Sequence, residues 1–301
     1  MLQRSAQAIK IGIFGSGYGG LTILSSIRRV LPQYDYIYLG DNARAPYGTH
    51  SFDVIYRYTL QAVNYLLSQD CTLIILACNT ASAKALRTIQ QKDLPKINSQ
   101  QPTANSQQQV NVLGVIRPTV EAVPSITKTG HVGILGTPAT ISSQSYVLEL
   151  EKINHQSPIT NHQSLVVTQQ ACPMWVPLIE AGEHNKPGAD YFVDLYLREI
   201  LSKDPLIDTL VLGCTHYPLL LEKIHRHLDI STSRGLEIKT ISQGDLVANS
   251  LADYLARHPE YRDQLSLNGT CRYLTTENAD RFSQSASVFL STPIHAEHVV
   301  V

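Results

Sequence analysis

TLIILACNT, residues 72–80, is the stretch that decides the predicted fold. It is an apolar run that ends in a small residue, a cysteine and an amide side chain, and TLVLGCTH at residues 209–216 repeats the pattern. Short apolar runs of this kind are typical of strands buried on both faces of a sheet. The sequence therefore predicts two buried strands, with Cys78 and Cys214 at their carboxyl ends.

Similar apolar runs surround these two strands and alternate with stretches of helical periodicity. Further strands are predicted at residues 8–14, 34–40, 110–116, 131–137 and 164–169. Helices are predicted between most of them, near residues 20–31, 51–68 and 80–91. Apolar strands separated by helices indicate parallel sheets with helices on both faces. The polar segment 92–109 interrupts the pattern and is predicted to be a surface loop.

The repeated pattern also indicates where a site would lie. Ligands of open α/β sheets bind beyond the carboxyl ends of the strands. Two strand-end cysteines in two similar halves are therefore expected to face one shared cleft. The predicted fold class is α/β, with two similar Rossmann-like or flavodoxin-like domains, largely parallel sheets and the active site in the cleft between the domains.

Composition excludes several classes of protein. Of the 301 residues, 43% are hydrophobic and 16% are charged, which provides enough apolar material for a buried core. The formal net charge is −1 and no Lys- or Arg-rich run occurs, so a nucleic-acid partner is not expected. No apolar stretch approaches the roughly 18 residues of a membrane-spanning helix, and the first residues lack the features of a signal peptide. We therefore expect a soluble cytoplasmic protein without a membrane partner.

Residues 15–20, GSGYGG, follow a predicted strand and open a predicted helix. They satisfy the GxGxxG pattern of dinucleotide sites, and Asp41 follows at the distance expected for a residue that binds the ribose. An NAD-dependent oxidoreductase is therefore one alternative function. Backbone N–H groups in such a turn hold any anion, however, including a plain carboxylate.

Five motifs, in order along the chain, resemble those of the cofactor-independent aspartate/glutamate racemases, and of the glutamate racemases in particular. They are GSGYGGLTIL, DNARAPYG, ACNTASA, QACPMWVPLIEAG and GCTHYPLL, within a likeness that spans roughly residues 9–290. The resemblance implies an isomerase that interconverts L- and D-glutamate without a cofactor. It also implies that the product D-glutamate serves peptidoglycan synthesis, and with it cell-wall formation and cell shape.

Racemisation removes the α-proton from one face of the carbon and returns a proton to the other face, so it needs two acid/base groups. Cysteine suits this task, because forming its thiolate at pH 7 costs only about 2 kcal/mol from a reference pKa of about 8.5. By resemblance, Cys78 acts on the D-enantiomer and Cys214 on the L-enantiomer.

The resemblance implies further site residues. Hydroxyls, amides and backbone N–H groups are expected to hold the substrate at Ser16, Tyr47, Gly48, Asn79, Thr80, Thr215 and His216. His216 is also expected to assist Cys214 in catalysis, and Glu180 to place a carboxylate on the same side. A Cys-x-His metal site is an alternative for Cys214 and His216, but no second ligand pair accompanies it, so no metal is expected.

Gly15 is where the chain departs from the family motif. The family has Phe-Asp-Ser-Gly where this chain has Phe-Gly-Ser-Gly at residues 14–17. By resemblance, that aspartate helps with the proton of the first cysteine and with the substrate ammonium, and Gly15 stands at this substrate-binding position without a side chain. Three outcomes stay open: a slower glutamate racemase, a racemase with altered substrate preference, or a binding protein that has lost turnover.

The resemblance also implies how the chain divides. Residues 1–116 together with 227–301 are expected to form the first domain, which carries Cys78, and residues 117–226 the second, which carries Cys214. The crossings near Ile116 and after Leu220 are expected to form a hinge. Glutamate is the expected small-molecule partner. Family members pair in different ways, so the sequence leaves open a homodimer and an activator from the cell-wall pathway.

Overall fold

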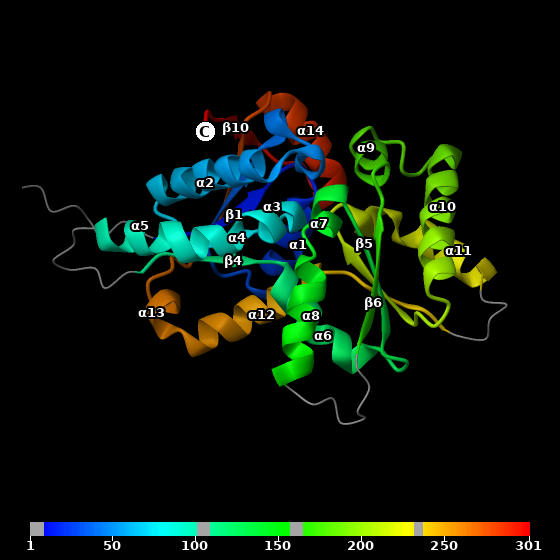
Figure 1. Ribbon diagram of the computed structural model, residues 1–301. Coiled ribbons are helices and arrows are strands. Elements are labelled where there is room, and N and C mark those ends of the chain that lie inside the picture. Colours follow the sequence, from blue (N-terminus) through cyan, green and yellow to red (C-terminus); the bar gives the residue numbers. More distant parts are fainter. Residues whose placement is uncertain (1–8, 101–108, 157–164, 232–236) are drawn as a thin grey trace, which may run out of the picture.

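The computed structural model describes residues 9–100, 109–156, 165–231 and 237–301. Their strands form two sheets, each built of parallel strands (Figure 1). The first sheet has the strand order β10-β9-β2-β1-β3-β4. Its strands are β1 (Ile11–Gly15), β2 (Tyr36–Gly40), β3 (Leu73–Leu76), β4 (Asn111–Gly114), β9 (Cys271–Thr275) and β10 (Ala296–His298). The second sheet has the order β6-β5-β7-β8. Its strands are β5 (His131–Gly136), β6 (Val166–Ala171), β7 (Thr209–Gly213) and β8 (Lys239–Ile241).

The two sheets repeat one topology. Within each run of four strands the order is second, first, third, fourth, as β2-β1-β3-β4 and again as β6-β5-β7-β8. This is the beginning of the flavodoxin-like doubly wound order, in which the crevice opens between the first and third strands. All pairings of the named strands in both sheets are parallel. The predicted fold class, two similar α/β units with parallel sheets, is confirmed.

Helices connect the strands and cover the sheets. Those nearest the first sheet are α1 (Gly20–Val30), α2 (Phe52–Ser68), α3 (Asn79–Lys84), α4 (Leu86–Thr88), α5 (Leu94–Gln100), α12 (Gly244–Arg257), α13 (Pro259–Arg262) and α14 (Ala279–Leu290). The others are α6 (Ile116–Ile126), α7 (Pro138–Ser142), α8 (Ser145–Gln156), α9 (Trp175–Glu180), α10 (Pro187–Lys203) and α11 (Leu221–Ser231). Among the described residues, no helix has the length and apolar character needed to cross a membrane.

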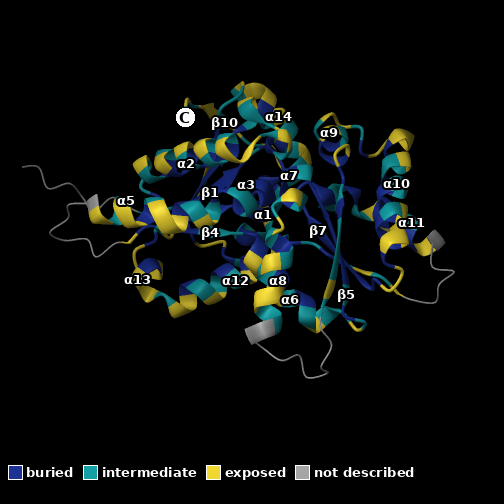
Figure 2. Ribbon diagram, viewed as in Figure 1, coloured by how far each residue is buried: buried dark blue, intermediate teal, exposed yellow. Residues whose placement is uncertain are grey.

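Strand β2 shows why the apolar runs form buried strands. Its five residues are all buried, because successive side chains point to opposite faces and helices cover both faces. Tyr36 and Tyr38 pack into a core with residues of α1, α12 and α14. Ile37 and Leu39 pack on the other face, with residues of α2. The buried strands appear dark blue inside the molecule, beneath the yellow outer faces of the helices (Figure 2).

The predicted loop at residues 92–109 is wrong where the structure describes it. A π-helical turn at Ile89–Asp93 leads into helix α5, which reaches Gln100. Leu94 is buried in the core beside α2, and this burial holds the polar segment as a helix despite its composition. Residues 101–108 lie outside the described part of the chain.

The chain passes between the two sheets twice. The first passage follows β4, at the start of α6, close to the boundary predicted at residue 116. The second boundary was expected at residue 226, but β8 lies beyond it and pairs with β7. If each sheet marks one domain, this crossing lies after Ile241, at the start of α12, which packs on both α1 and α6. The division into two domains stays a prediction.

Candidate active site

A small cavity, about 50 Å³ in volume, lies where the strand ends of the two sheets meet. It is lined by the predicted site residues Ser16, Tyr47, Gly48, Cys78, Asn79, Thr80, Glu180, Cys214, Thr215 and His216. Gly15 is not among the lining residues. The volume corresponds to roughly two water molecules, so the cavity is closed to a larger ligand in this arrangement.

Cys78 follows β3 and forms the N-cap of α3. Its Sγ lies 3.0 Å from Ser16 Oγ, and it accepts a hydrogen bond from the backbone N–H of Ala81 at 3.5 Å. Burial raises the pKa of the Cys78 thiol, the hydrogen bonds from Ser16 and Ala81 oppose that rise, and the charge of Cys214 adds to it. The thiol form of Cys78 is therefore favoured, with hydrogen-bond donors in place for a thiolate.

Cys214 follows β7, the strand equivalent to β3, and has a different neighbour. His216 Nδ1 lies 3.7 Å from Cys214 Sγ, and His216 Nε2 lies 2.9 Å from Glu180 Oε1. Burial lowers the pKa of His216, but the hydrogen bonds and charges of Cys214 and Glu180 outweigh it and raise the pKa to about 10. The His216 ring thus has one nitrogen beside Cys214 Sγ and the other beside the Glu180 carboxylate, which orients the ring.

Lack of space, and not backbone conformation, explains the glycines of the turn at residues 15–20. All of this turn is described, and none of its glycines has a positive φ. A Cβ at Gly17 would lie 2.6 Å from Glu180 Oε1, and one at Gly19 would overlap His216. The backbone N of Gly19 also lies 3.2 Å from His216 Nε2. The glycines thus let the turn contact the other half of the molecule, which gives the GxGxxG match a packing explanation.

The carboxylate of Asp41 is already hydrogen-bonded, mainly to the loop that follows it. Its carboxylate accepts hydrogen bonds from Arg44 Nε at 2.7 and 2.8 Å, from the Tyr47 hydroxyl and from Thr276 Oγ1. These contacts use both oxygens, so Asp41 is not available for a ribose, and the dinucleotide alternative is not favoured. The Tyr47 hydroxyl is engaged by the same contact, which leaves the ring and backbone of Tyr47 and the backbone of Gly48 to line the cavity.

Asn79 belongs to a buried polar network that joins the two sheets. Its Nδ2 donates to Gln243 Oε1 at 2.5 Å, and its Oδ1 accepts from the Tyr146 hydroxyl at 2.7 Å. Gln243 Nε2 lies within hydrogen-bond distance of Asn79 Oδ1, the Tyr146 hydroxyl and Thr119 Oγ1. Gln243 immediately precedes α12, where the chain returns to the first sheet. The side chain of Asn79 therefore fixes how the two halves meet.

Three threonines form a second contact between the halves. Thr80 Oγ1 lies 3.0 Å from Thr137 Oγ1 and 3.4 Å from Thr140 Oγ1. Thr137 follows β5 and lines the cavity, as does Cys172 after β6. Thr137 and Cys172 were not predicted from the sequence as lining residues. Their place at strand ends is the signal that could have found them.

The described residues show no group of three or more His, Cys, Asp or Glu side chains that could hold a metal ion. Glu180 lies near Cys214 and His216, but it bonds to the imidazole in the manner of an orienting carboxylate. Cys214, His216 and Glu180 thus contact one another as a cluster of titratable side chains.

Trp175, the single tryptophan of the chain, lies at the start of α9, the helix that ends at Glu180. Its ring is fully buried and meets the ring of Tyr217 edge-on, with centroids 4.7 Å apart. Tyr217 directly follows His216. This aromatic pair fixes α9 against the segment that carries Cys214 and His216.

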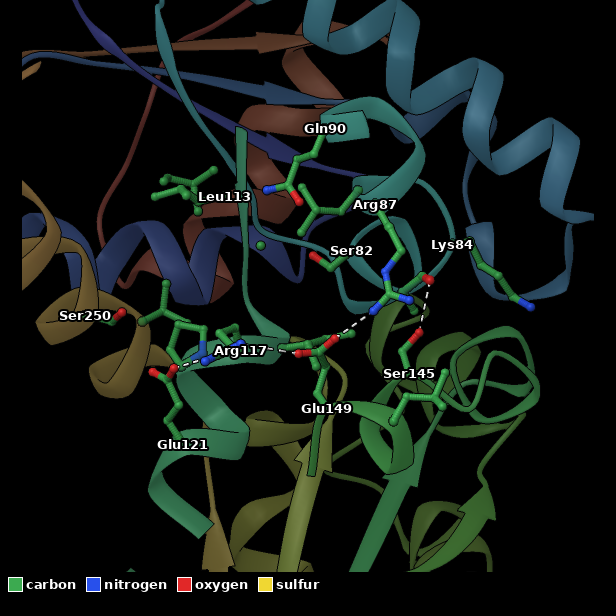
Figure 3. A pocket seen from close by; sticks show the side chains of 18 of the residues that line it. Ser82, Lys84, Arg87, Gln90, Leu113, Arg117, Glu121, Ser145, Glu149 and Ser250 are labelled. Carbon is green, nitrogen blue, oxygen red and sulfur yellow. Dashed lines mark hydrogen bonds and ion pairs between the residues drawn. The ribbon is translucent and has the colours of Figure 1, made fainter. Parts of the chain in front are cut away.

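A larger cavity, about 670 Å³ in volume, is lined by residues of both halves away from the cysteines (Figure 3). At its rim, Glu149 of α8 lies 3.0 Å from Arg87 of α4 and 3.7 Å from Arg117 of α6. Lys152 contacts the same carboxylate at 2.6 Å. Glu149 is therefore the centre of an ion-pair cluster that joins α8 to the first half.

Comparisons with known proteins agree with this geometry. Residues 21–240 match the model of the Asp/Glu/Hydantoin racemase family. The glutamate racemase of Persephonella marina is 38% identical over 295 residues, which is 96% of each chain. Among solved structures, glutamate racemase isoform RacE1 from Bacillus anthracis has a TM-score of 0.80, with 29% identity and 99% coverage of both chains. Glutamate racemase from Francisella tularensis, in complex with D-glutamate, has a TM-score of 0.79, with 32% identity and coverage of 97% of this chain and 98% of that one.

Proposed function

The chain belongs to the Asp/Glu/Hydantoin racemase family, and from this premise we propose that Cys78 and Cys214 are the two acid/base groups that interconvert L- and D-glutamate. The enzyme is an amino-acid racemase, and glutamate is its substrate. One observation carries the assignment of the bases: two thiols, each after the third strand of an equivalent sheet, line the same cavity.

The chemistry needs one thiolate and one thiol at a time. The thiolate of one cysteine takes the α-proton of bound glutamate, and the electron pair stays on the substrate as a carbanion delocalised into its carboxylate. The thiol of the other cysteine then gives its proton to the opposite face of the carbon. Each turnover therefore exchanges the protonation states of Cys78 and Cys214, and the reverse reaction restores them.

The neighbours of each cysteine support this exchange. The ring of His216 lies beside Cys214 Sγ, where its Nδ1 is placed to exchange a proton with the sulfur, and the Glu180 carboxylate holds the ring. Burial favours the thiol at Cys78, while Ser16 and the backbone N–H of Ala81 are placed to donate when the thiolate forms. We assign His216 and Glu180 to the Cys214 step on this basis.

Substrate contacts fall to the groups that line the cavity. The hydroxyls of Ser16, Thr80 and Thr215 and the backbone of Gly48 remain candidates for the two carboxylates of glutamate. Tyr47 and Asn79 line the cavity, but their polar side-chain atoms are engaged by Asp41, Gln243 and Tyr146. These two residues therefore contribute through their backbone or ring surface. Gly15 lies outside the lining and is not assigned a substrate contact.

The small volume of the cavity supports a hinged opening between the two domains, because glutamate is larger than the space that is present.

By family likeness, we place the enzyme in the cytoplasm, where it supplies D-glutamate for peptidoglycan. Sedimentation of the full chain with and without glutamate tests assembly into a homodimer, which that likeness leaves open.

Solvent-deuterium exchange at the α-carbon tests the function directly. L- and D-glutamate are each incubated with the protein in deuterated buffer and followed by NMR, while circular dichroism records racemisation. Exchange and racemisation from both enantiomers are expected. Binding of glutamate without exchange from either enantiomer would show that the scaffold is kept and the chemistry lost.

A further inference from the structure

Tyr38 reaches the turn at residues 15–20 from the neighbouring strand. It lies on β2, opposite Ile13 of β1, and its side chain is fully buried. Its hydroxyl donates a hydrogen bond to the backbone carbonyl oxygen of Gly17 at 2.9 Å. The middle of the turn is therefore tied to the sheet by a side chain that is distant from it in sequence.

The hydroxyl of Tyr38 occupies the space beside Gly15. A Cβ built at Gly15 would overlap that hydroxyl, and it would also lie 3.0 Å from the ring carbon Cζ and from the carbonyl oxygen of Gly17. Gly15 does not have a positive φ, so its backbone is one that other residues adopt readily. Glycine is needed here because Tyr38 fills the place of a side chain.

The turn that Tyr38 holds touches both cysteine centres. Ser16, on one side of Gly17, lies 3.0 Å from Cys78 Sγ. Gly19, on the other side, contacts the ring of His216, which lies beside Cys214. A displacement of the Gly17 carbonyl would move both contacts.

We propose that Tyr38 is a positioning residue for the two-cysteine site: its hydroxyl anchors the Gly17 carbonyl and so holds Ser16 against Cys78, and Gly15 is the glycine that makes room for it. This inference rests on the proposed function for its kinetic readouts. Burial, together with the nearby charges of Cys78 and Glu180, raises the pKa of Tyr38 well above its ordinary value. The hydroxyl thus keeps its proton and remains a donor throughout the working pH range.

The first test is Tyr38→Phe, with Tyr36→Phe as the matched control. Tyr36 lies on the same strand and face, is equally buried, and donates to the Leu31 carbonyl at 2.6 Å, away from the cavity. Each variant loses one buried hydrogen bond from a tyrosine to a backbone carbonyl. Tyr38→Phe is expected to lower kcat roughly 10-fold with little change in KM, whereas Tyr36→Phe keeps the wild-type kcat.

The pH dependence separates positioning from mere stability. The Ser16 hydrogen bond lowers the pKa of Cys78, so a loosened turn raises it. In Tyr38→Phe, alkylation of Cys78 by iodoacetamide, followed by mass spectrometry of the Cys78 peptide, should shift to higher pH. The alkylation profile of Tyr36→Phe should match wild type, even if both variants lower Tm equally.

A double variant tests the pairing of Tyr38 with Gly15. Gly15→Ala alone is expected to lower kcat roughly 100-fold, because the new methyl displaces the tyrosine hydroxyl. In Gly15→Ala/Tyr38→Phe the hydroxyl, which makes the closest contact, is gone, so the rate should rise well above that of Gly15→Ala, toward that of Tyr38→Phe. Effects of the two substitutions that simply multiply would overturn the steric pairing.

The outcomes distinguish this inference from the proposed function. A wild-type protein that does not racemise glutamate contradicts the proposed function, and the Cys78 alkylation profiles then still test the positioning role. A Tyr38→Phe protein with the kcat and alkylation profile of Tyr36→Phe overturns the positioning role while racemisation stands. Should Gly15→Ala fail to fold, the comparison of the two Phe variants decides.

Discussion

Cys78 and Cys214 occupy equivalent places in two equivalent sheets, yet their surroundings differ. Each follows the third strand of a second-first-third-fourth order. Cys78 meets a serine hydroxyl and a backbone N–H at a helix N-cap, whereas Cys214 meets an imidazole backed by a carboxylate. The repeated fold thus determines where the two sulfurs lie, and the neighbouring side chains give each sulfur different hydrogen-bonding partners.

This difference suits a reaction that must start from one thiolate and one thiol. Two identical buried thiols would compete for the same proton, and each negative charge would raise the pKa of the other. His216 and Glu180 break that symmetry, because an imidazole held by a carboxylate lies beside Cys214, whereas a hydroxyl and a backbone N–H lie beside Cys78.

The largest effect is expected from the sulfurs themselves. Cys78→Ser and Cys214→Ser should each lower kcat by roughly 10³-fold or more in both directions, because serine cannot form an anion near neutral pH. Circular dichroism of L- and D-glutamate solutions measures the rates. A variant that keeps a near-normal rate would show that its cysteine is not one of the two bases.

Glu180→Gln should make the Cys214 centre resemble the Cys78 centre. We expect kcat to fall by roughly 100-fold, because an uncharged amide no longer holds His216 as the imidazolium. Ser16→Ala, its counterpart at Cys78, should cost only about 10-fold, since it removes a single hydroxyl. Equal losses in the two variants would mean that the two centres do not differ in the way the structure indicates.

The same Glu180 variant carries a pH signature in stability. The pKa of His216 is raised from 6.5 to about 10 in the folded protein, so its protonation stabilises the fold fully below pH 6.5 and ceases to do so above about 10. The Tm difference between wild type and Glu180→Gln should therefore be largest near pH 6.5 and shrink as the pH approaches 10. Calorimetry across this window checks the sign, and a difference that grows with pH would contradict it.

The side chain of Gln243 belongs to the buried polar network that connects the two halves of the molecule. Gln243→Leu leaves the buried polar atoms of Asn79 and Tyr146 without a partner, which should cost about 2 kcal/mol of unfolding free energy. That corresponds to a fall in Tm of roughly 4 °C. Thermal unfolding measures the stability. An unchanged Tm would mean that the network does not hold the halves together.

The smallest effect is expected at the rim of the larger cavity. Glu149→Gln removes the centre of the ion pairs with Arg87, Arg117 and Lys152, but these partners are half exposed. Such pairs contribute less than about 1 kcal/mol, so Tm should barely change and the remaining effect should fade in high salt. A loss as large as that of Gln243→Leu would identify this cluster as a second main link between the halves.

The fold and the positions of both cysteines could be predicted because their signals are local. Residues 72–80 and 209–216 each carry a strand and its terminal cysteine within one short stretch. Gln243 and Tyr146 could not be predicted, since each meets Asn79 only through the folding of distant segments. The sheet to which β8 belongs could not be predicted for the same reason: β8 is short and partly polar, and only its pairing with β7 assigns it to a sheet.

Gly15 shows a further limit of motif comparison. Compared with the family motif, Gly15 lacks a carboxylate, and the sequence alone indicates no replacement for it. In the structure the space beside it contains the hydroxyl of Tyr38, whose donor reaches the turn itself. The effect of a substitution can therefore be judged only when the residues that pack against that position are known.

The aromatic pair of Trp175 and Tyr217 places the single tryptophan of the chain in the half of the molecule that carries Cys214. Indole emission from this chain arises at Trp175 alone, one short helix from Glu180 and ring-to-ring with the residue after His216. Fluorescence intensity and lifetime consequently sense events in that half, and the Cys78 half has no such reporter. Trp175 is therefore an intrinsic fluorescent probe of the Cys214 half. In a rapid-mixing experiment its emission can time the arrival of a ligand at Cys214.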